Sequence, residues 1–290
     1  MNTIEVKCRA KLNLSLDIIG IREDGYHLMD MVMQSVDLAD TLFFKKTDKN
    51  EIEIVSATGD VPENEDNLVY RAAKLLKERY KIADGVKIEI QKRIPLNSGL
   101  GGGSADAAGT IVSLAKLWEI DVQEDVLFEI GLMLGADIPF CMRGGTARVG
   151  GIGERINNLK PLVNIPTVIL MPSTGISTRE AFKRIDRLRD YDRPNTEILI
   201  SAIESKNIKV ISNNLINVFK TSGLSPQSDR PIELLINHGA MGASMSGSGS
   251  AVFGIFDSKE SALSALRRVE DKYVGFLTRF VDSGLSLKIK

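Results

Sequence analysis

A glycine-rich segment in the first half of the chain is the stretch whose residue types and spacing point most directly to chemistry. It reads Gly99-Leu100-Gly101-Gly102-Gly103-Ser104 and joins a predicted strand to a predicted helix that begins near Ser104. Closely spaced glycines let backbone N–H groups approach an anion, and the start of a helix adds about half a positive charge. The segment therefore predicts a phosphate-binding loop; a plain strand-to-helix turn capped by Ser104 is the alternative.

Two widespread phosphate-loop signatures do not fit this segment. A Walker A loop ends in Gly-Lys-Ser/Thr, whereas Gly103 is followed directly by Ser104 and the loop contains no lysine. The dinucleotide fingerprint requires G-x-G-x-x-G, which glycines at 99, 101, 102 and 103 do not supply. A loop of this kind must take its cation from elsewhere in the chain.

Lys11 and Asp137 could complete a site for phosphoryl transfer. Lys11 stands at the start of an alternating apolar segment, and Asp137 lies between small and apolar residues directly after a predicted helix. Transfer to an alcohol requires that the acceptor hydroxyl is positioned, that its proton is accepted and that the phosphate charge is neutralised. A lysine and an aspartate that converge on the hydroxyl would meet these needs. Taken singly, each could equally be a surface lysine or a turn aspartate.

Taken in order along the chain, these segments resemble the motifs of the GHMP kinase superfamily. Residues 10–14 are similar to its first motif, 95–108 to its phosphate loop, 135–140 to the segment that follows, and 244–250 to a C-terminal glycine motif. Gly25-Tyr26-His27 resembles the branch whose substrate is 4-diphosphocytidyl-2-C-methyl-D-erythritol. Arg9, Asn97 and Ser98 depart from the usual family spelling beside the site.

The resemblance implies a kinase that transfers the γ-phosphoryl group of ATP to the 2-hydroxyl of that cytidine-diphosphate-bearing substrate, with Mg²⁺ accompanying the nucleotide. Asp137 would be the catalytic base, and Lys11 would keep it ionised and orient the hydroxyl. No magnesium ligand is assigned. The residues that would wrap the ATP phosphates are Pro95, Leu96, Asn97, Ser98, Gly99, Leu100, Gly101, Gly102, Gly103, Ser104 and Ala105.

The resemblance also implies a cytidine pocket. Tyr26 would stack on the cytosine and His27 would hydrogen-bond its edge, while Phe182, four residues after Thr178, would form a second wall. A core position remains the alternative for Phe182, and a turn for the glycines of the C-terminal motif. The residues expected to bind the substrate are Asn13, Tyr26, His27, Thr178, Phe182, Gly247 and Gly249.

Two competing functions remain open on the sequence. A GHMP-type kinase for another small alcohol, such as homoserine or a mevalonate-like acid, would need an arginine for the carboxylate and would leave Tyr26 and His27 without a role. A non-catalytic RNA-binding module is disfavoured by the net charge of -1 and by the 6% of aromatic residues.

The elements that must position these residues form an α+β pattern. Strands are predicted at 3–7, 12–18, 31–36, 41–45, 52–55, 86–90, 146–149, 167–171 and 250–256, and helices at 67–80, 104–118, 123–134, 178–188, 196–204, 210–219, 232–237 and 259–273. The strand at 12–18 alternates and should be half-buried. The glycine cluster at 144–153 is interpreted as turns. We expect a two-domain GHMP kinase fold with the active site in the inter-domain cleft: residues 1–155 form the N-terminal nucleotide-binding and catalytic domain, and 156–290 the C-terminal substrate-binding domain.

The overall composition is that of an ordinary globular protein of 290 residues, with 43% hydrophobic and 26% charged residues. Two cysteines and two histidines are too few for a disulfide scaffold or a zinc cluster. No apolar run approaches the length of a membrane span, and the first residues do not resemble a signal peptide. We therefore expect a cytoplasmic protein whose partner is a small molecule, with no nucleic acid and no membrane; the oligomeric state is left open.

Overall fold

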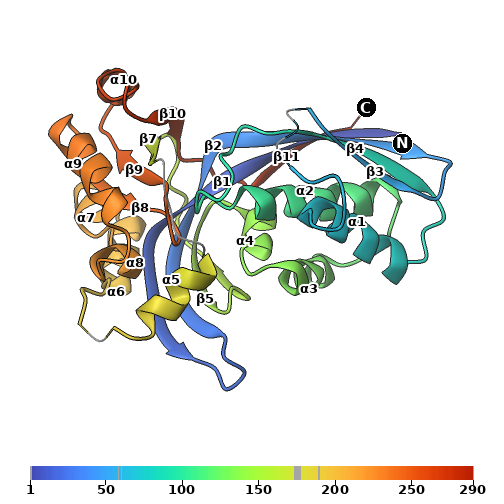
Figure 1. The fold of residues 1–290 in the computed structure, drawn as a ribbon, viewed down its shortest axis with the longest axis horizontal. Coiled ribbons are helices and arrows are strands. Elements are labelled where there is room, and N and C mark those ends of the chain that lie inside the picture. Colours follow the sequence, from blue (N-terminus) through green and yellow to red (C-terminus); the bar gives the residue numbers. More distant parts are fainter. Residues whose placement is uncertain (1, 58, 60, 173–177, 189, 290) are drawn as a thin grey trace.

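The computed structural model describes residues 2–57, 59, 61–172, 178–188 and 190–289, and its strands form two sheets (Figure 1). The larger sheet has the order β11-β1-β2-β4-β3, with β5 paired to β2 and β6 paired to β5. Its strands are β1 (Thr3–Ile21), β2 (His27–Thr47), β3 (Ile52–Ser56), β4 (Gly85–Gln91), β5 (Thr146–Gly151), β6 (Arg155–Asn158) and β11 (Leu285–Ile289). The smaller sheet has the order β10-β7-β9-β8 and consists of β7 (Pro166–Met171), β8 (Gly242–Met245), β9 (Val252–Ile255) and β10 (Val274–Arg279).

The helices divide between the two sheets. One group covers a face of the larger sheet: α1 (Leu68–Arg79), α2 (Gly102–Leu117), α3 (Glu124–Leu134) and α4 (Ile138–Arg143) (Figure 1). The other group lies in the second half of the chain: α5 (Thr178–Ile185), α6 (Thr196–Glu204), α7 (Ile208–Asn213), α8 (Val218–Thr221), α9 (Asp229–Asn237) and α10 (Lys259–Arg267), with a short 3-10 turn at Pro226–Ser228. In the part of the chain described, no helix is long and apolar enough to cross a bilayer.

The segment that carries Lys11 is buried on both faces, so the prediction of a half-buried strand at 12–18 is wrong. A register irregularity between Asn13 and Ser15 divides the strand between two cores. Leu12 and Leu14 pack with apolar residues of the second sheet, whereas Leu16 joins the core beneath the larger sheet. Because both faces of β1 are covered from residue 10 to residue 18, the polar residues of this part are enclosed as well, and this places Lys11 inside the molecule.

Local sequence signals hold at some helix ends and fail at others. The Asn67 side chain accepts a hydrogen bond from the Val69 N–H at 2.9 Å, which confirms the predicted start of α1. The single helix expected at 210–219 is wrong, because the chain breaks between α7 and α8 and Asn217 caps α8 instead. An asparagine that caps a helix competes with continuation of the preceding one.

The last strand of the chain returns to the first sheet. β11 pairs antiparallel with β1, from Ile4 opposite Ile289 to Cys8 opposite Leu285, so the two ends of the chain lie side by side (Figure 1). Two strands of the larger sheet therefore do not follow a division into 1–155 and 156–290: β11 lies wholly in the second part, and β6 is cut by the boundary.

Candidate active site

A cavity of about 580 Å³ collects most of the predicted site residues from distant parts of the chain. Its lining includes Lys11, Asn13, Asp137, Thr178, Phe182, Gly247 and, from the glycine-rich segment, Pro95, Leu96, Asn97, Ser98, Gly99, Gly101, Gly102, Gly103 and Ser104. Leu100 and Ala105 are buried beneath the loop, and Tyr26, His27 and Gly249 are not among the lining residues. The cavity thus lies where segments of both halves meet.

The glycine-rich segment forms a loop that leads directly into α2. Gly99 and Gly101 adopt left-handed backbone angles, with φ of 79° and 72°, which other residues adopt only with strain. α2 begins at Gly102, two residues before the predicted start, and no side chain caps its first turn. Its first N–H groups therefore remain available to an anion in the cavity.

Lys11 and Asp137 approach each other at the wall of this cavity. Lys11 Nζ lies 3.5 Å from Asp137 Oδ2 and donates a hydrogen bond of 2.7 Å to Asn13 Oδ1. The lysine stem passes against Gly101, where a Cβ atom would come within 2.9 Å of Lys11 Cγ. Asp137 precedes the short helix α4, which the sequence did not reveal. The ammonium is nearly buried, so its charge acts on the carboxylate with little screening by water.

The C-terminal glycine motif packs directly on the phosphate loop. Asn13 Oδ1 accepts a second hydrogen bond, of 2.9 Å, from the Gly247 N–H, and Ser246 Oγ donates to the Gly99 carbonyl at 3.0 Å. A Cβ atom at Gly99 would lie only 2.3 Å from the Ser246 carbonyl oxygen. Glycine is therefore required at this contact by lack of space as well as by backbone angle.

Two of the aromatic residues predicted for the cytidine pocket, His27 and Phe182, lie together, whereas Tyr26 lies apart from them. The His27 and Phe182 rings are 4.5 Å apart between centroids, and His27 Nε2 hydrogen-bonds Asp186 Oδ1 at 2.7 Å. Thr178 is close by, with its hydroxyl 3.0 Å from that of Ser248. Tyr26 is 59% exposed and lies outside the cavity lining, with the Arg22 guanidinium 5.5 Å from the centroid of its ring.

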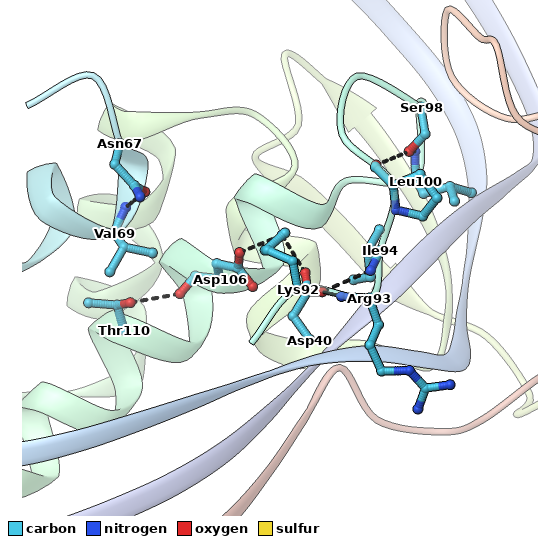
Figure 2. Close-up of polar contacts among 11 residues, drawn as sticks. Asp40, Asn67, Val69, Lys92, Arg93, Ile94, Ser98, Leu100, Asp106 and Thr110 are labelled. Atoms are coloured by element: carbon cyan, nitrogen blue, oxygen red, sulfur yellow. Dashed lines mark hydrogen bonds and ion pairs between the residues drawn. The ribbon is translucent and has the colours of Figure 1, made fainter. Parts of the chain in front are cut away.

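Lys92 is a cavity-lining residue that the sequence reasoning missed. Its ammonium bonds to Asp40 Oδ2 at 2.5 Å and to Asp106 Oδ2 at 2.7 Å, in a nearly buried cluster beside the first turn of α2 (Figure 2). Burial lowers the pKa of Lys92, but the two carboxyl groups outweigh it and raise that pKa overall. Burial and the Asp40 charge raise the pKa of Asp106 to about 8. The sequence did contain a signal for Lys92: the glycine-rich loop has no lysine of its own, and Lys92 lies shortly before it.

The glycine cluster at 144–153 does more than turn the chain. A Cβ atom at Gly153 would lie 2.3 Å from the Ala136 carbonyl oxygen, so this glycine packs against the residue that precedes Asp137. Its neighbour Ile152 lines the cavity. The cluster therefore supports the turn that presents the Asp137 carboxylate, which the interpretation as plain turns did not include.

Comparison with known proteins agrees with this geometry. The chain matches the model of the GHMP kinases N terminal domain over residues 67–145 and that of the GHMP kinases C terminal domain over 200–275. A curated 4-diphosphocytidyl-2-C-methyl-D-erythritol kinase from Clostridioides difficile (strain 630) is 42% identical over 276 residues, which span 94% of this chain and 93% of that protein. The kinase of the same name from Thermoanaerobacter pseudethanolicus is 42% identical over 290 residues, 99% of each chain.

Solved structures share the fold over nearly the whole chain. A crystal structure of 4-(cytidine 5'-diphospho)-2C-methyl-D-erythritol kinase has a TM-score of 0.79 and 29% identity, and covers 95% of this chain and 98% of its own. A homoserine kinase from Cytophaga hutchinsonii has a TM-score of 0.78 at 21% identity, with 99% and 98% covered, which shows the fold alone. The predicted two-domain α+β fold is confirmed. The glycine loop, the Lys11–Asp137 pair and these matches place the chain in the GHMP kinase family.

Proposed function

We propose that the chain transfers the γ-phosphoryl group of ATP to the 2-hydroxyl of 4-diphosphocytidyl-2-C-methyl-D-erythritol. The observation that carries the proposal is the composition of the cavity: the Lys11–Asp137 pair, the glycine loop and Phe182 all line the same cavity. Relatives that bear the name of this kinase match the chain at 42% identity over nearly its full length.

The geometry supports a direct transfer. With the phosphates of ATP on the N–H groups of the loop and α2, the acceptor hydroxyl would lie between Lys11 and Asp137. Asp137 accepts the proton as the O–H bond breaks, the hydroxyl oxygen forms the new bond to the γ-phosphorus, and the bond from that phosphorus to the bridging oxygen breaks to leave ADP. Lys11, held by Asn13, stabilises the carboxylate charge and orients the hydroxyl.

Recognition of the cytidine end would fall to the wall formed by His27 and Phe182. An aromatic ring stacks on a base, and an imidazole nitrogen can bond to its polar edge. His27 is already bonded to Asp186 at one nitrogen, which fixes the orientation of its ring. The exposed Tyr26 would have to turn inward to stack on the cytosine. Residues 1–155 would then supply the nucleotide and catalytic groups, and 156–290 most of the remaining substrate contacts.

Magnesium fits this site as a companion of ATP, where it would neutralise phosphate charge. The described residues contain no group of three or more His, Cys, Asp or Glu side chains placed to hold a metal ion. Of the described residues in the cavity wall, Asp137 alone carries a carboxylate. Mg²⁺ retains waters and binds phosphates readily, so most of its oxygen ligands would come from the nucleotide and solvent.

A coupled assay of ADP release with a panel of alcohols tests the proposal. We expect turnover with 4-diphosphocytidyl-2-C-methyl-D-erythritol and no turnover with homoserine or mevalonate. CDP should inhibit the reaction by competing with the cytidine-bearing substrate. The described cavity lining contains two cations, Lys11 and Lys92, each already bonded within the protein, and no arginine for a substrate carboxylate. Turnover of homoserine without inhibition by CDP would show that the substrate assignment is wrong.

A further inference from the structure

The strand before the phosphate loop ends in a buried arrangement of charges that the proposed mechanism does not use. The backbone ladder between β2 and β4 ends at Thr41 opposite Gln91. One residue before Thr41 on β2, the Asp40 side chain replaces the backbone as hydrogen-bond acceptor: its Oδ1 accepts from the N–H groups of Arg93 at 2.6 Å and Ile94 at 2.8 Å. Asp40 is fully buried. These bonds fix the direction in which the chain enters the loop.

The other end of the loop is tied to the same carboxylate through Lys92. Lys92 Nζ bonds to Asp40 Oδ2 and to Asp106 Oδ2, and Asp106 belongs to the second turn of α2 (Figure 2). A Cβ atom at Gly102 would lie 3.4 Å from Lys92 Nζ, so the ammonium touches the start of the helix. Asp40 therefore joins the residue before the loop to the helix after it.

The charge of this cluster matters because it lies beneath a site for a polyanion. Two ionised carboxylates and one ammonium would leave a net charge of -1 there. Burial and the Asp40 charge raise the pKa of Asp106 to about 8. Asp106 Oδ1 is buried without a hydrogen-bond partner among the described residues, which costs a neutral acid less than a carboxylate. Both observations favour a protonated Asp106 at neutral pH.

We propose that Asp40, Lys92 and Asp106 form a clamp that holds the phosphate loop in its nucleotide-binding geometry, and that the two carboxyl groups carry one proton between them. Asp40 is a positioning residue: it acts on ATP through the loop backbone and through Lys92. Among the described residues, the titratable groups that interact electrostatically with Asp106 are Lys92, Asp40 on β2, Cys8 on β1 and Cys141 on α4. Burial raises the pKa of both thiols, so Cys8 and Cys141 stay neutral and leave the charge to the clamp.

The inference rests on the proposed function only in that ATP is the nucleotide, so its test measures ATP binding directly by calorimetry, without the alcohol. In Asp40→Asn, an amide oxygen can still accept from the loop N–H groups, but its NH₂ group faces the Lys92 ammonium. We expect ATP affinity to fall about tenfold or more, the size of a lost hydrogen bond to a charged group. Asp30→Asn is the matched control, because Asp30 lies on the same strand and pairs with Arg148 away from the loop; its affinity should stay within about twofold of the parent chain.

Asp106→Asn tests the proton separately and does not depend on how well the Asp40 variant folds. Asparagine resembles the protonated acid, so this variant should bind ATP normally at pH 7. In the parent chain, affinity should fall severalfold between pH 7 and pH 9 as Asp106 ionises beneath the loop, and the variant should lack this fall. Equal pH dependence in both proteins, or unchanged ATP affinity in a folded Asp40→Asn, would overturn the clamp. Absence of ATP binding by the parent chain would instead refute the proposed function.

Discussion

The Lys11–Asp137 pair gives a prediction whose size can be worked from the structure. Two unit charges 3.5 Å apart attract by about 5 kcal/mol at an effective dielectric constant of about 20. The Asp137 side chain is 32% exposed, so water screens part of this attraction, and we expect a coupling of about 2 kcal/mol. Such a coupling corresponds to roughly thirtyfold in rate.

A double-mutant cycle in kcat measures that coupling. Asp137→Asn removes the proton acceptor and should lower kcat on the order of a hundredfold or more. Lys11→Met removes the charge that stabilises the carboxylate and should cause a loss of similar size. The double variant should lose about thirtyfold less than the product of the two single losses, because each change already removes the shared interaction.

The assay is ADP release at saturating ATP and alcohol, with urea unfolding of each variant as the control for the fold. If the two losses simply multiply, Lys11 and Asp137 act independently and the reasoning from their separation is wrong. Unchanged kcat in Asp137→Asn would remove that residue from the mechanism altogether.

Further predictions concern the cytidine wall, the loop contact and the pH dependence of stability. Phe182→Ala should raise the KM for the cytidine-bearing substrate about tenfold with little change in the KM for ATP, because a stacked ring is worth roughly 1–3 kcal/mol; equal changes in both constants would contradict a substrate wall. Gly99→Ala should lower the free energy of unfolding by about 1–3 kcal/mol in urea titration, since its φ is positive and Ser246 leaves no room. Gly103→Ala should not destabilise, because Gly103 is helical and a Cβ atom there would make an ordinary contact of 3.7 Å with Leu68 Cδ1. Folding raises the pKa of Asp106, so protonated Asp106 stabilises the fold fully below about pH 4, and this stabilisation is lost as pH rises toward 8. Relative to Asp106→Asn, the free energy of unfolding of the parent chain should fall by at most about 1.4 kcal/mol per pH unit over this range. A difference in unfolding free energy that does not change with pH would refute the sign.

The parts of the site predicted from the sequence depend on local chemistry. Positive φ angles at glycines and an asparagine cap are properties of a few adjacent residues, so the glycine-rich loop before α2 and the start of α1 could be predicted. Phosphate binding by that loop stays a prediction. The pairing of Lys11 with Asp137 followed from the needs of the reaction, because each residue alone has an ordinary alternative.

The parts that could not be predicted depend on long-range pairing. Nothing near Asp40 in the sequence shows that its carboxylate meets the residues after β4, since that contact follows from the register of β2 with β4. The burial of both faces of β1 likewise depends on a second sheet formed more than 150 residues later in the chain. Tyr26 and His27 are adjacent in sequence, but β2 begins at His27, whose ring contacts Phe182, whereas Tyr26 lies outside the strand at the end of the preceding turn.

These contacts explain why glycines from separate parts of the chain belong to one site. Gly99 allows the C-terminal motif to touch the phosphate loop, Gly101 allows Lys11 to pass, and Gly153 allows the turn before Asp137 to pack. In each case a Cβ atom would lie closer than 3.0 Å to the group that approaches. These glycines therefore serve to let neighbouring segments pack closely, rather than to make the chain flexible. Alanine at Gly99, Gly101 or Gly153 should consequently displace the segment that packs against it, which carries Ser246, Lys11 or Ala136 respectively. We expect this displacement even where the glycine itself touches neither ATP nor the alcohol.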